Sequence, residues 1–244
     1  MPAESTSTCR IYKHLLSYSA DNNLEVLPED RIYWLCNPNN PTGNVLNKHL
    51  IRHIVRENPR YLYVVDQSYE DYTLSPVIHP QDMTDCYNLM LVYSLSKKYC
   101  IPGLRLGYIF SSPIIIDRLR QIRQPWAVNA IAIEAGKYMV EKDPKMIPDL
   151  PAYLAEAQRL RQQLSALDGL KVMDTATHFM LVNIERGNAH DLKKWLIARY
   201  GILVREATNF RGLDNHYFRV SARTPEDDDR LVEALKTYLQ SPED

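Results

Sequence analysis

The stretch "YSLSKKYCIPGLRLGY", residues 93–108, holds two adjacent lysines among small hydroxyl residues, with an arginine eight positions after the first lysine. It overlaps the end of the apolar run "LMLVYS" (89–94), which predicts a buried strand. Ser94, Ser96 and Lys97 therefore fall where a strand ends, and in open α/β sheets that edge binds ligands. The stretch thus indicates a buried strand followed by a cluster of cations and hydroxyls.

Short β-rich runs alternate with longer amphipathic segments on both sides of this stretch. The runs are "RIYWLC" (31–36), "YLYVVD" (61–66), "LMLVYS" and "LGYIF" (106–110). Between the first two lies "NKHLIRHIVREN" (47–58), whose apolar spacing suits a helix. This alternation predicts an α/β fold with a mostly parallel sheet flanked by helices.

The second half of the chain has a different pattern. Residues 112–141 and 151–167 read as long helices, and the Pro-containing segment "EKDPKMIPDLP" (141–151) breaks the chain between them. Five segments follow, read as strand, helix, strand, strand and helix: "KVMDTATHFMLVNI", "HDLKKWLIARYG", "ILVREA", "HYFRVSA" and "PEDDDRLVEALKTYLQ". We expect a large domain over residues 1–145 and a small C-terminal α+β domain over 146–244.

Composition limits the class of protein. The chain has 244 residues, of which 45% are hydrophobic and 24% charged, and this is the profile of a soluble globular protein. Lys and Arg total 29 against 30 Asp and Glu, so no long-range field would attract nucleic acid. The apolar runs are short, and "MPAESTST" lacks the pattern of a secretory leader. We expect a cytoplasmic protein without a membrane span.

The four cysteines do not suggest a metal site or a disulfide framework. Cys9, Cys36, Cys86 and Cys100 form no CxxC pair and lie far apart in the sequence. We therefore expect reduced, mostly structural thiols and no bound metal.

Polar residues also follow the first two predicted strands. "NPNNPTG" (37–43) comes directly after "RIYWLC", and a simple turn would explain it, although an Asn amide there can also donate to a ligand oxygen. The second strand ends in Asp66, with Tyr69 three residues on, and a lone strand-end Asp is usually a cap or turn residue. Three successive strand ends thus carry polar groups of complementary kinds.

Together these groups suit pyridoxal phosphate, which offers a ring nitrogen, a phenolic oxygen, an aldehyde and a phosphate. On the motifs N-P-x-N-P-T-G, D-x-x-Y and S-x-S-K with an arginine eight residues later, the sequence resembles the fold-type I pyridoxal-phosphate enzymes, the aspartate aminotransferase superfamily. The motifs occur in the family's order. The resemblance runs over essentially the whole chain.

The resemblance implies roles for the residues of the opening stretch. Lys97 would bond covalently to the cofactor and, once released, move protons at the substrate α-carbon, whereas Lys98 would be a solvated neighbour. Arg105 would bind the cofactor phosphate together with Ser94 and Ser96.

The resemblance also assigns the polar residues of the other two strand ends. Asp66 would lie against the pyridine nitrogen and keep it protonated, because an opposite charge favours the charged form. Asn40 and Tyr69 would hydrogen-bond the phenolic oxygen of the cofactor.

Three arginines in the C-terminal part are candidate substrate ligands. They are Arg205, Arg219 and Arg223, and exposed strand-end arginines without a ligand are the alternative interpretation. The resemblance implies that Arg219 binds the substrate α-carboxylate through two parallel hydrogen bonds. It implies that Arg205 contacts the phosphate in relatives that use phosphorylated amines.

Within the superfamily two relatives compete, threonine-phosphate decarboxylase and histidinol-phosphate aminotransferase. The segments "IPGLRLGY", "RQPWAVNAIA" and "NFRGLDNHYFRVSAR", together with Arg223, resemble the decarboxylase more. The implied reaction is decarboxylation of L-threonine O-3-phosphate to 1-amino-2-propanol phosphate in cobalamin biosynthesis, with the aminotransferase as the alternative. His178 in "THFMLV" departs from both families, which usually place Asn there, and a lone strand-end His is more often structural than catalytic.

The resemblance carries two further expectations. Superfamily members have on the order of a hundred residues before this point, including a Gly/Ser-rich phosphate turn and an aromatic residue that stacks on the ring. Neither is visible in the sequence, so we expect a large domain without its N-terminal part, and a non-catalytic truncated form is a further alternative. The family builds its active sites at a homodimer interface, so we also expect a homodimer, acting on a small phosphorylated amino acid.

Overall fold

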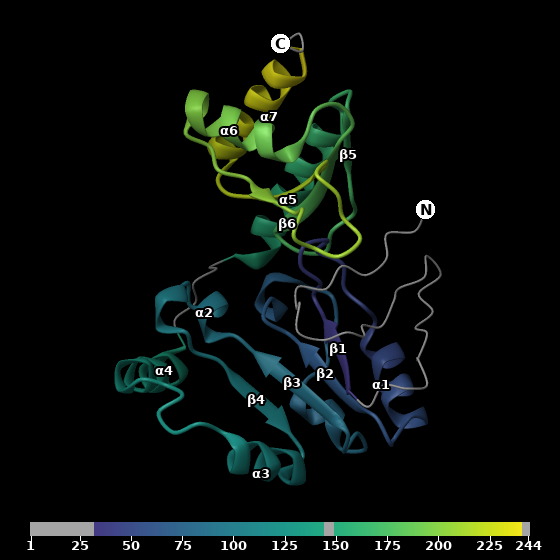
Figure 1. Ribbon diagram of the computed structural model, residues 1–244, viewed down its shortest axis with the longest axis vertical. Helices are drawn as coiled ribbons and strands as arrows, with labels where there is room; N and C mark the ends of the chain where they lie inside the picture. Colours follow the sequence, from purple (N-terminus) through teal and green to yellow (C-terminus); the bar gives the residue numbers. More distant parts are fainter. Residues whose placement is uncertain (1–31, 144–148, 241–244) are drawn as a thin grey trace.

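The computed structural model describes residues 32–143 and 149–240, which form two lobes (Figure 1). The first lobe, purple to teal, contains a sheet in the order β1-β2-β3-β4, and the second, green to yellow, a sheet in the order β5-β6-β8-β7. The expectations for residues 1–8 and for Cys9 lie outside the described residues, as does much of the predicted break, at 144–148. The division into two domains near residue 145 stays a prediction.

The first sheet confirms the predicted α/β architecture. β1 (Ile32–Cys36), β2 (Leu62–Asp66) and β3 (Leu89–Tyr93) are parallel, and β4 (Tyr108–Ser111) is antiparallel to β3. β3 is buried on both faces, as expected for a strand inside a parallel sheet. In the register, Cys36 faces Asp66 and Asp66 faces Val92, so the three parallel strands end at the same level.

The helices of the first lobe differ in how well they are covered. α1 (Lys48–Glu57) begins after Asn47, whose side chain accepts a hydrogen bond from the His49 N–H at 2.8 Å, and it buries Ile51 and Val55. The short elements are η1 (Glu70–Tyr72), η2 (Pro80–Met83), α2 (Leu95–Lys98) and η3 (Pro102–Leu104). α3 (Pro113–Ile122) buries none of its residues.

The single helix predicted over 112–141 is wrong. The segment forms α3 and α4 (Ala130–Lys142), with a break at 123–129. Pro125 explains the break, because it lacks an N–H donor and disfavours helical geometry at Gln124. A new helix starts at Asn129, whose side chain accepts from the Ala132 N–H at 2.8 Å.

The first lobe exposes many apolar side chains on β4, α3 and α4. We define the β4 apolar face as the exposed apolar residues of β4, α3 and α4: Tyr108, Ile109, Phe110, Ile114, Ile122, Ile131, Ile133, Tyr138 and Val140. In Figure 1, α3 and α4 lie beside β4 at the edge of the lobe. No other described strand pairs with the outer edge of β4.

The second lobe is an α+β unit, as predicted. Its elements are α5 (Leu150–Ser165), β5 (Leu170–Val172), β6 (Phe179–Ile184), α6 (Ala189–Tyr200), β7 (Arg205–Glu206), β8 (Tyr217–Ser221) and α7 (Pro225–Gln240). All strand pairs are antiparallel. Leu160, Leu164, Met180 and Phe218 are fully buried in its core.

The strand predicted over 171–184 is two strands. β5 and β6 are separated by a turn in which the Thr175 hydroxyl donates to the Phe179 carbonyl at 2.6 Å and the Thr177 hydroxyl to the same oxygen at 3.1 Å. Threonine hydroxyls compete with ladder hydrogen bonds in this way. The turn faces the first lobe.

The second lobe sits over the carboxyl ends of β1, β2 and β3 (Figure 1). The Ala176 N–H donates to the Gly43 carbonyl at 3.0 Å, and the Tyr69 and Phe179 rings are 4.9 Å apart. Gly43 has φ +77°, and a Cβ there would lie 2.7 Å from the Phe179 carbonyl oxygen, so only glycine fits. Among the described helices, none is long and apolar enough to cross a membrane.

Candidate active site

The loops after the three parallel strands lie side by side at one edge of the first sheet. The Asn37 N–H donates to the Asp66 carbonyl at 2.9 Å, and the Gln67 N–H to the Val92 carbonyl at 2.8 Å. These bonds continue the ladder just past the strand ends. They bring the three predicted motifs together.

The loop 37–43 is held rigidly by its own asparagines. Asn37 accepts from the Leu46 N–H at 2.7 Å and donates to the Leu46 carbonyl at 3.2 Å, while the Asn39 amide donates to the Thr42 hydroxyl at 2.8 Å. Asn40 is thereby presented to the second lobe. Its Oδ1 accepts a hydrogen bond from Arg219 Nη1 at 2.7 Å, which joins two of the predicted site residues.

Asp66 is fixed at the end of β2. Its Oδ1 accepts from the Ser68 N–H at 2.9 Å and from the Ser68 hydroxyl at 2.5 Å. Burial, and then the charge of Asp66, raise the pKa of the Cys36 thiol to about 12, so this thiol stays neutral beside the carboxylate. Within the described part of the chain Asp66 forms no ion pair, so its charge remains for a ligand.

The two adjacent lysines have different environments. Lys98 Nζ lies 3.2 Å from an Asp143 carboxylate oxygen and 3.8 Å from one of Asp71. Burial lowers the pKa of Lys98, but these two acids outweigh burial and raise it, so this amine is held charged. Lys97 Nζ instead lies 5.5 Å from the centre of the Tyr69 ring, and its side chain is exposed.

Tyr69 and Tyr72 link Lys97 to β2. Tyr69 is 9% exposed, and the Tyr72 hydroxyl donates to the Lys97 carbonyl at 2.9 Å. This second bond fixes the backbone that carries the amine. Tyr72 was not among the predicted site residues, because the D-x-x-Y motif includes Asp66 and Tyr69 but not Tyr72.

The predicted phosphate ligands are placed unequally. Ser96 is buried; its hydroxyl donates to the Leu106 carbonyl at 3.2 Å and accepts from the Leu106 N–H at 3.3 Å. It therefore holds the loop that carries Arg105. The Ser94 hydroxyl makes no capping bond to α2, and Arg105 is exposed, with Nη1 donating to the Pro102 carbonyl at 3.1 Å.

Arg205 and Arg219 are opposite each other on paired strands. They are register partners in the antiparallel pair of β7 and β8, so both side chains leave the same face of the second sheet. The Arg219 guanidinium lies 4.9 Å from the centre of the Phe179 ring, and its Nε is buried without a partner in the described residues. Arg223 is placed differently, since its Nε donates to Asp227 at 3.0 Å on the surface.

His178 lies where the two lobes meet. Its ring centre is 4.2 Å from that of Tyr72, 5.5 Å from Tyr153 and 6.2 Å from Tyr69. Burial, and then the charges of Arg219 and Lys97, lower the pKa of His178 to about 3. The sequence flagged this residue only as a departure from related families.

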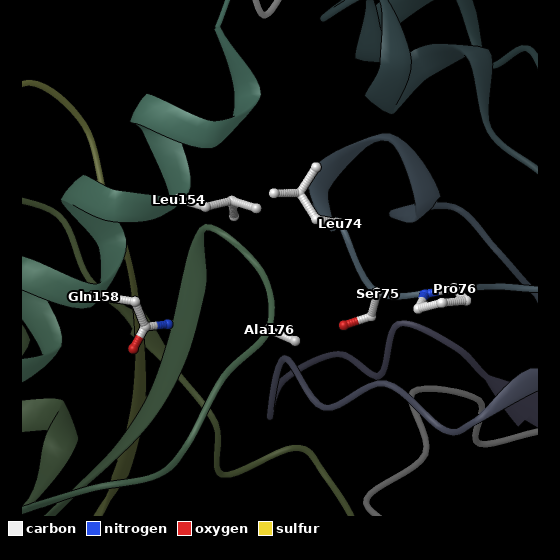
Figure 2. Close-up of a pocket in the computed structure, with 6 residues that line it drawn as sticks. All are labelled: Leu74, Ser75, Pro76, Leu154, Gln158 and Ala176. Carbon is white, nitrogen blue, oxygen red and sulfur yellow. The ribbon is translucent and has the colours of Figure 1, made fainter.

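A cavity of about 410 Å³ opens elsewhere between the lobes, lined by Leu74, Ser75, Pro76, Leu154, Gln158 and Ala176. Figure 2 shows Leu74 and Leu154 reaching toward each other across it from the two lobes. None of the predicted site residues lines this cavity. Its lining contains no charged side chain, so the strand ends are the better candidate for chemistry.

The chemistry of the donor set at the strand ends fits pyridoxal phosphate. Lys97 offers an amine that no acid neutralises within the described residues, Asp66 a fixed carboxylate, and Tyr69 a hydroxyl on a ring that lies beside the Lys97 amine. The Arg105 guanidinium and the Ser94 hydroxyl are suited to a phosphate. The described residues contain no cluster of metal ligands, and Cys36, Cys86 and Cys100 are free thiols.

The fold and this donor set define a pyridoxal-phosphate enzyme of fold type I. Residues 5–235 match the family described as aminotransferase class I and II, and the chain belongs to that family. Membership implies pyridoxal 5′-phosphate as the cofactor.

Several relatives are similar to the chain. A putative threonine-phosphate decarboxylase from Caldanaerobacter subterraneus subsp. tengcongensis is 33% identical over 212 residues, covering 83% of this chain and 56% of the relative. A histidinol-phosphate aminotransferase from the same organism is 33% identical over 216 residues, covering 86% and 57%. The chain thus spans little more than half the length of these curated relatives.

Solved structures agree with the fold. The crystal structure of L-threonine-O-3-phosphate decarboxylase from Porphyromonas gingivalis superimposes with a TM-score of 0.83 at 38% identity, over 86% of this chain and 65% of that one. The structure of histidinol-phosphate aminotransferase from Clostridium acetobutylicum has a TM-score of 0.71 at 22% identity, over 85% and 64%. The second likeness concerns the fold alone.

Proposed function

We propose that the protein decarboxylates L-threonine O-3-phosphate to 1-amino-2-propanol phosphate, as a pyridoxal-phosphate-dependent step of cobalamin biosynthesis. The observation that carries the proposal is the cross-strand pair of Arg205 and Arg219. The similarity to the Porphyromonas gingivalis decarboxylase supports it.

The arginine pair suits a small substrate with two anionic groups. Like charges directly opposite on paired strands are destabilising. Anions bound by both guanidiniums remove that repulsion. Threonine phosphate carries a carboxylate for Arg219 and a phosphate for Arg205 on one short skeleton, and Arg223 is proposed to add to the same anion site.

The residues of the first lobe supply the reaction's other needs. Bound pyridoxal phosphate supplies a ring that accepts the electrons released when a bond to the substrate α-carbon breaks. Asp66 would keep the ring nitrogen protonated, Asn40 and Tyr69 would orient the ring through its phenolic oxygen, and Arg105, Ser94 and Ser96 would hold the phosphate or its loop. Lys97 would bond covalently to the cofactor and would move a proton at the substrate α-carbon.

The position of the carboxylate decides which bond breaks. Arg219 would bind the carboxylate and so orient the bond between the α-carbon and the carboxylate for cleavage, with carbon dioxide as the leaving group. A proton from Lys97 then takes its place on the α-carbon. An orientation that exposes the α-hydrogen instead would lead to transamination.

Histidinol-phosphate aminotransferase activity is the second candidate, because a relative with that name is equally similar. Histidinol phosphate has no carboxylate, so it would leave one guanidinium of the pair without a partner. Such a mismatch costs about 1 to 3 kcal/mol, or roughly tenfold to a hundredfold in specificity.

The test compares the two reactions of the cofactor-loaded protein. We expect carbon dioxide from threonine phosphate to form faster than 2-oxoglutarate is transaminated with histidinol phosphate. Faster transamination would replace the decarboxylase proposal with the aminotransferase. Bound cofactor without either product would favour the non-catalytic form.

We also propose that the protein works as a cytoplasmic homodimer with a small-molecule substrate and without nucleic acid or membrane partners. We propose further that residues 1–145 bind the cofactor and residues 146–244 the substrate carboxylate.

A further inference from the structure

His178 is held in a fixed orientation at the junction of the lobes. Its ring is packed against Tyr72 from the first lobe and lies parallel to Tyr153 from the second, with an interplanar angle of 22°. Its carbonyl accepts from the Ala222 N–H at 2.7 Å, and the Ala222 carbonyl accepts from the Tyr153 hydroxyl at 2.9 Å. The imidazole is therefore preorganised before any ligand arrives.

The ring lies close to both ends of the candidate site. Phe179, the next residue, carries the Arg219 guanidinium over its face at 4.9 Å, and Tyr72 donates to the carbonyl of Lys97. Both cations act on the imidazole and, with burial, keep it neutral. His178 is thus within electrostatic reach of both the Lys97 amine and the Arg219 guanidinium.

The two ring nitrogens are not equivalent. Nδ1 is buried and has no hydrogen-bond partner, whereas Nε2 is not among the buried, unpartnered atoms and forms no hydrogen bond within the described chain. A buried orphan N–H is disfavoured more than a buried orphan acceptor. The neutral ring therefore carries its proton on Nε2, the nitrogen that solvent or a ligand can reach.

We propose that His178 is a substrate-binding residue whose Nε2–H donates a hydrogen bond to the carboxylate that Arg219 binds. The inference rests on the proposed function, because it takes the substrate to be an amino acid with a carboxylate. It makes His178 a determinant of specificity for carboxylate-bearing substrates. A neutral donor suits this place, since a third cation beside Lys97 and Arg219 would add to their mutual repulsion.

The first test measures binding rather than turnover. In a Lys97→Ala background, which cannot complete a turnover, calorimetry compares L-threonine O-3-phosphate with 1-amino-2-propanol phosphate, which differs only by lacking the carboxylate. His178→Phe keeps an aromatic ring but loses the donor, so it should weaken threonine phosphate by about tenfold and leave the carboxylate-free amine within about twofold. His178→Asn, which keeps a donor, should stay closer to the parent. Equal effects of His178→Phe on both ligands would overturn the proposal.

The second test does not depend on the folding of a His178 variant. In the Lys97→Ala protein with ¹⁵N-labelled histidine, threonine phosphate should shift the His178 Nε2 resonance, and the carboxylate-free amine should not. An unmoved resonance at saturating threonine phosphate would refute the contact. These readouts stay separate from the proposed function, because a protein that releases no carbon dioxide can still show the contact, and an active decarboxylase can lack it.

Discussion

At the scale of single residues, the two adjacent lysines show how the environment selects one amine for chemistry. Lys98 is tied to Asp71 and Asp143, whereas Lys97 faces the Tyr69 ring. An amine held charged by two acids is a poor nucleophile. The order S-x-S-K predicts the same choice from the sequence.

We predict that Lys97→Ala abolishes covalent attachment of the cofactor, while Lys98→Ala retains it. Borohydride reduction followed by peptide mapping locates the pyridoxyl group. Lys98→Ala is the matched control, since it removes a neighbouring amine from the same short helix. A pyridoxyl group on Lys98 of the unmodified protein would show that the assignment is wrong.

For Asp66→Asn, we expect a folded protein that binds the cofactor but turns over at least about a hundredfold more slowly. The Asn side-chain oxygen can still accept from Ser68, so the local turn survives. The ring nitrogen, however, loses its anionic partner. Steady-state kinetics beside a cofactor absorption spectrum measure both effects, and turnover near that of the parent would reduce Asp66 to a turn residue.

The sequence predicts candidate site residues where they lie in a short local motif. It does not predict contacts between residues that are far apart in the chain. The motifs predict Asn40, Asp66 and Lys97 as a set, and the register of three parallel strands brings their loops together. No local pattern predicts that Asn40 would bond to Arg219, or that Ser96 would hold Leu106. Those contacts depend on how the lobes and loops pack.

At the scale of elements, β3 and β4 approach closely just beyond their paired residues. A Cβ on Gly107 would lie 2.5 Å from the Tyr93 carbonyl oxygen, whereas one on Gly103 would meet nothing within 4 Å. The end of β3, which presents Ser94, therefore requires a residue without a side chain at position 107.

Gly107→Ala should destabilise the protein by roughly 1 to 3 kcal/mol, because backbone atoms must move to admit the methyl group. Gly103→Ala is the matched control and should change stability by less than about 1 kcal/mol. Urea denaturation measures both. Equal free energies of unfolding for the two variants would mean that the end of β3 moves to admit the methyl group without loss of stability.

Element types were predicted better than element limits. The four short β-rich runs of the first lobe all became strands; β1, β2 and β3 bury apolar residues on one or both faces, whereas β4 pairs with β3 although its apolar residues are exposed. The helix over 112–141 and the strand over 171–184 were wrong because Pro125 and the Thr175 and Thr177 hydroxyls interrupt otherwise continuous patterns. The apolar periodicity predicts a continuous element, whereas the proline and the threonine hydroxyls favour a break. Only the folded structure shows that the break occurs.

At the scale of the whole molecule, stability depends on carboxyls that burial keeps protonated. Burial, and then the charge of Asp71, raise the pKa of Glu70 to about 7, from an unfolded value near 4.5. The folded state therefore binds more protons than the unfolded state between those values, and stability falls as pH rises through this window.

Glu70→Gln should raise the free energy of unfolding by about 1 to 2 kcal/mol at about pH 8, after allowance for solvent screening, and change it little near pH 4.5. Gln retains an oxygen to accept from Gln67. Thermal melts across this pH range measure the difference. Glu57→Gln, at a carboxyl that is 66% exposed, is the control, and a gain of equal size at both pH values would contradict the titration account.

The β4 apolar face should make the chain self-associate as concentration rises, because a concentration of exposed apolar side chains on neighbouring elements is unfavourable in water. Ile114 and Ile122, 77% and 78% exposed, are the residues to change. The double variant Ile114→Lys, Ile122→Lys should shift light-scattering masses toward the monomer. Leu203→Lys, at a residue 72% exposed in the other lobe, should not, and equal masses for all three proteins would exclude this face as the cause.

The bond between Asn40 and Arg219 also bears on how the protein is made. Its partners are 179 positions apart in the sequence, so the first lobe's strand ends leave the ribosome long before their arginine does. At roughly 5 to 20 residues per second, the interval is on the order of ten to forty seconds. For much of that time the nascent chain carries Asp66 and Lys97 without the second lobe, and cofactor present in the cell meets an open strand edge before it can meet a finished site.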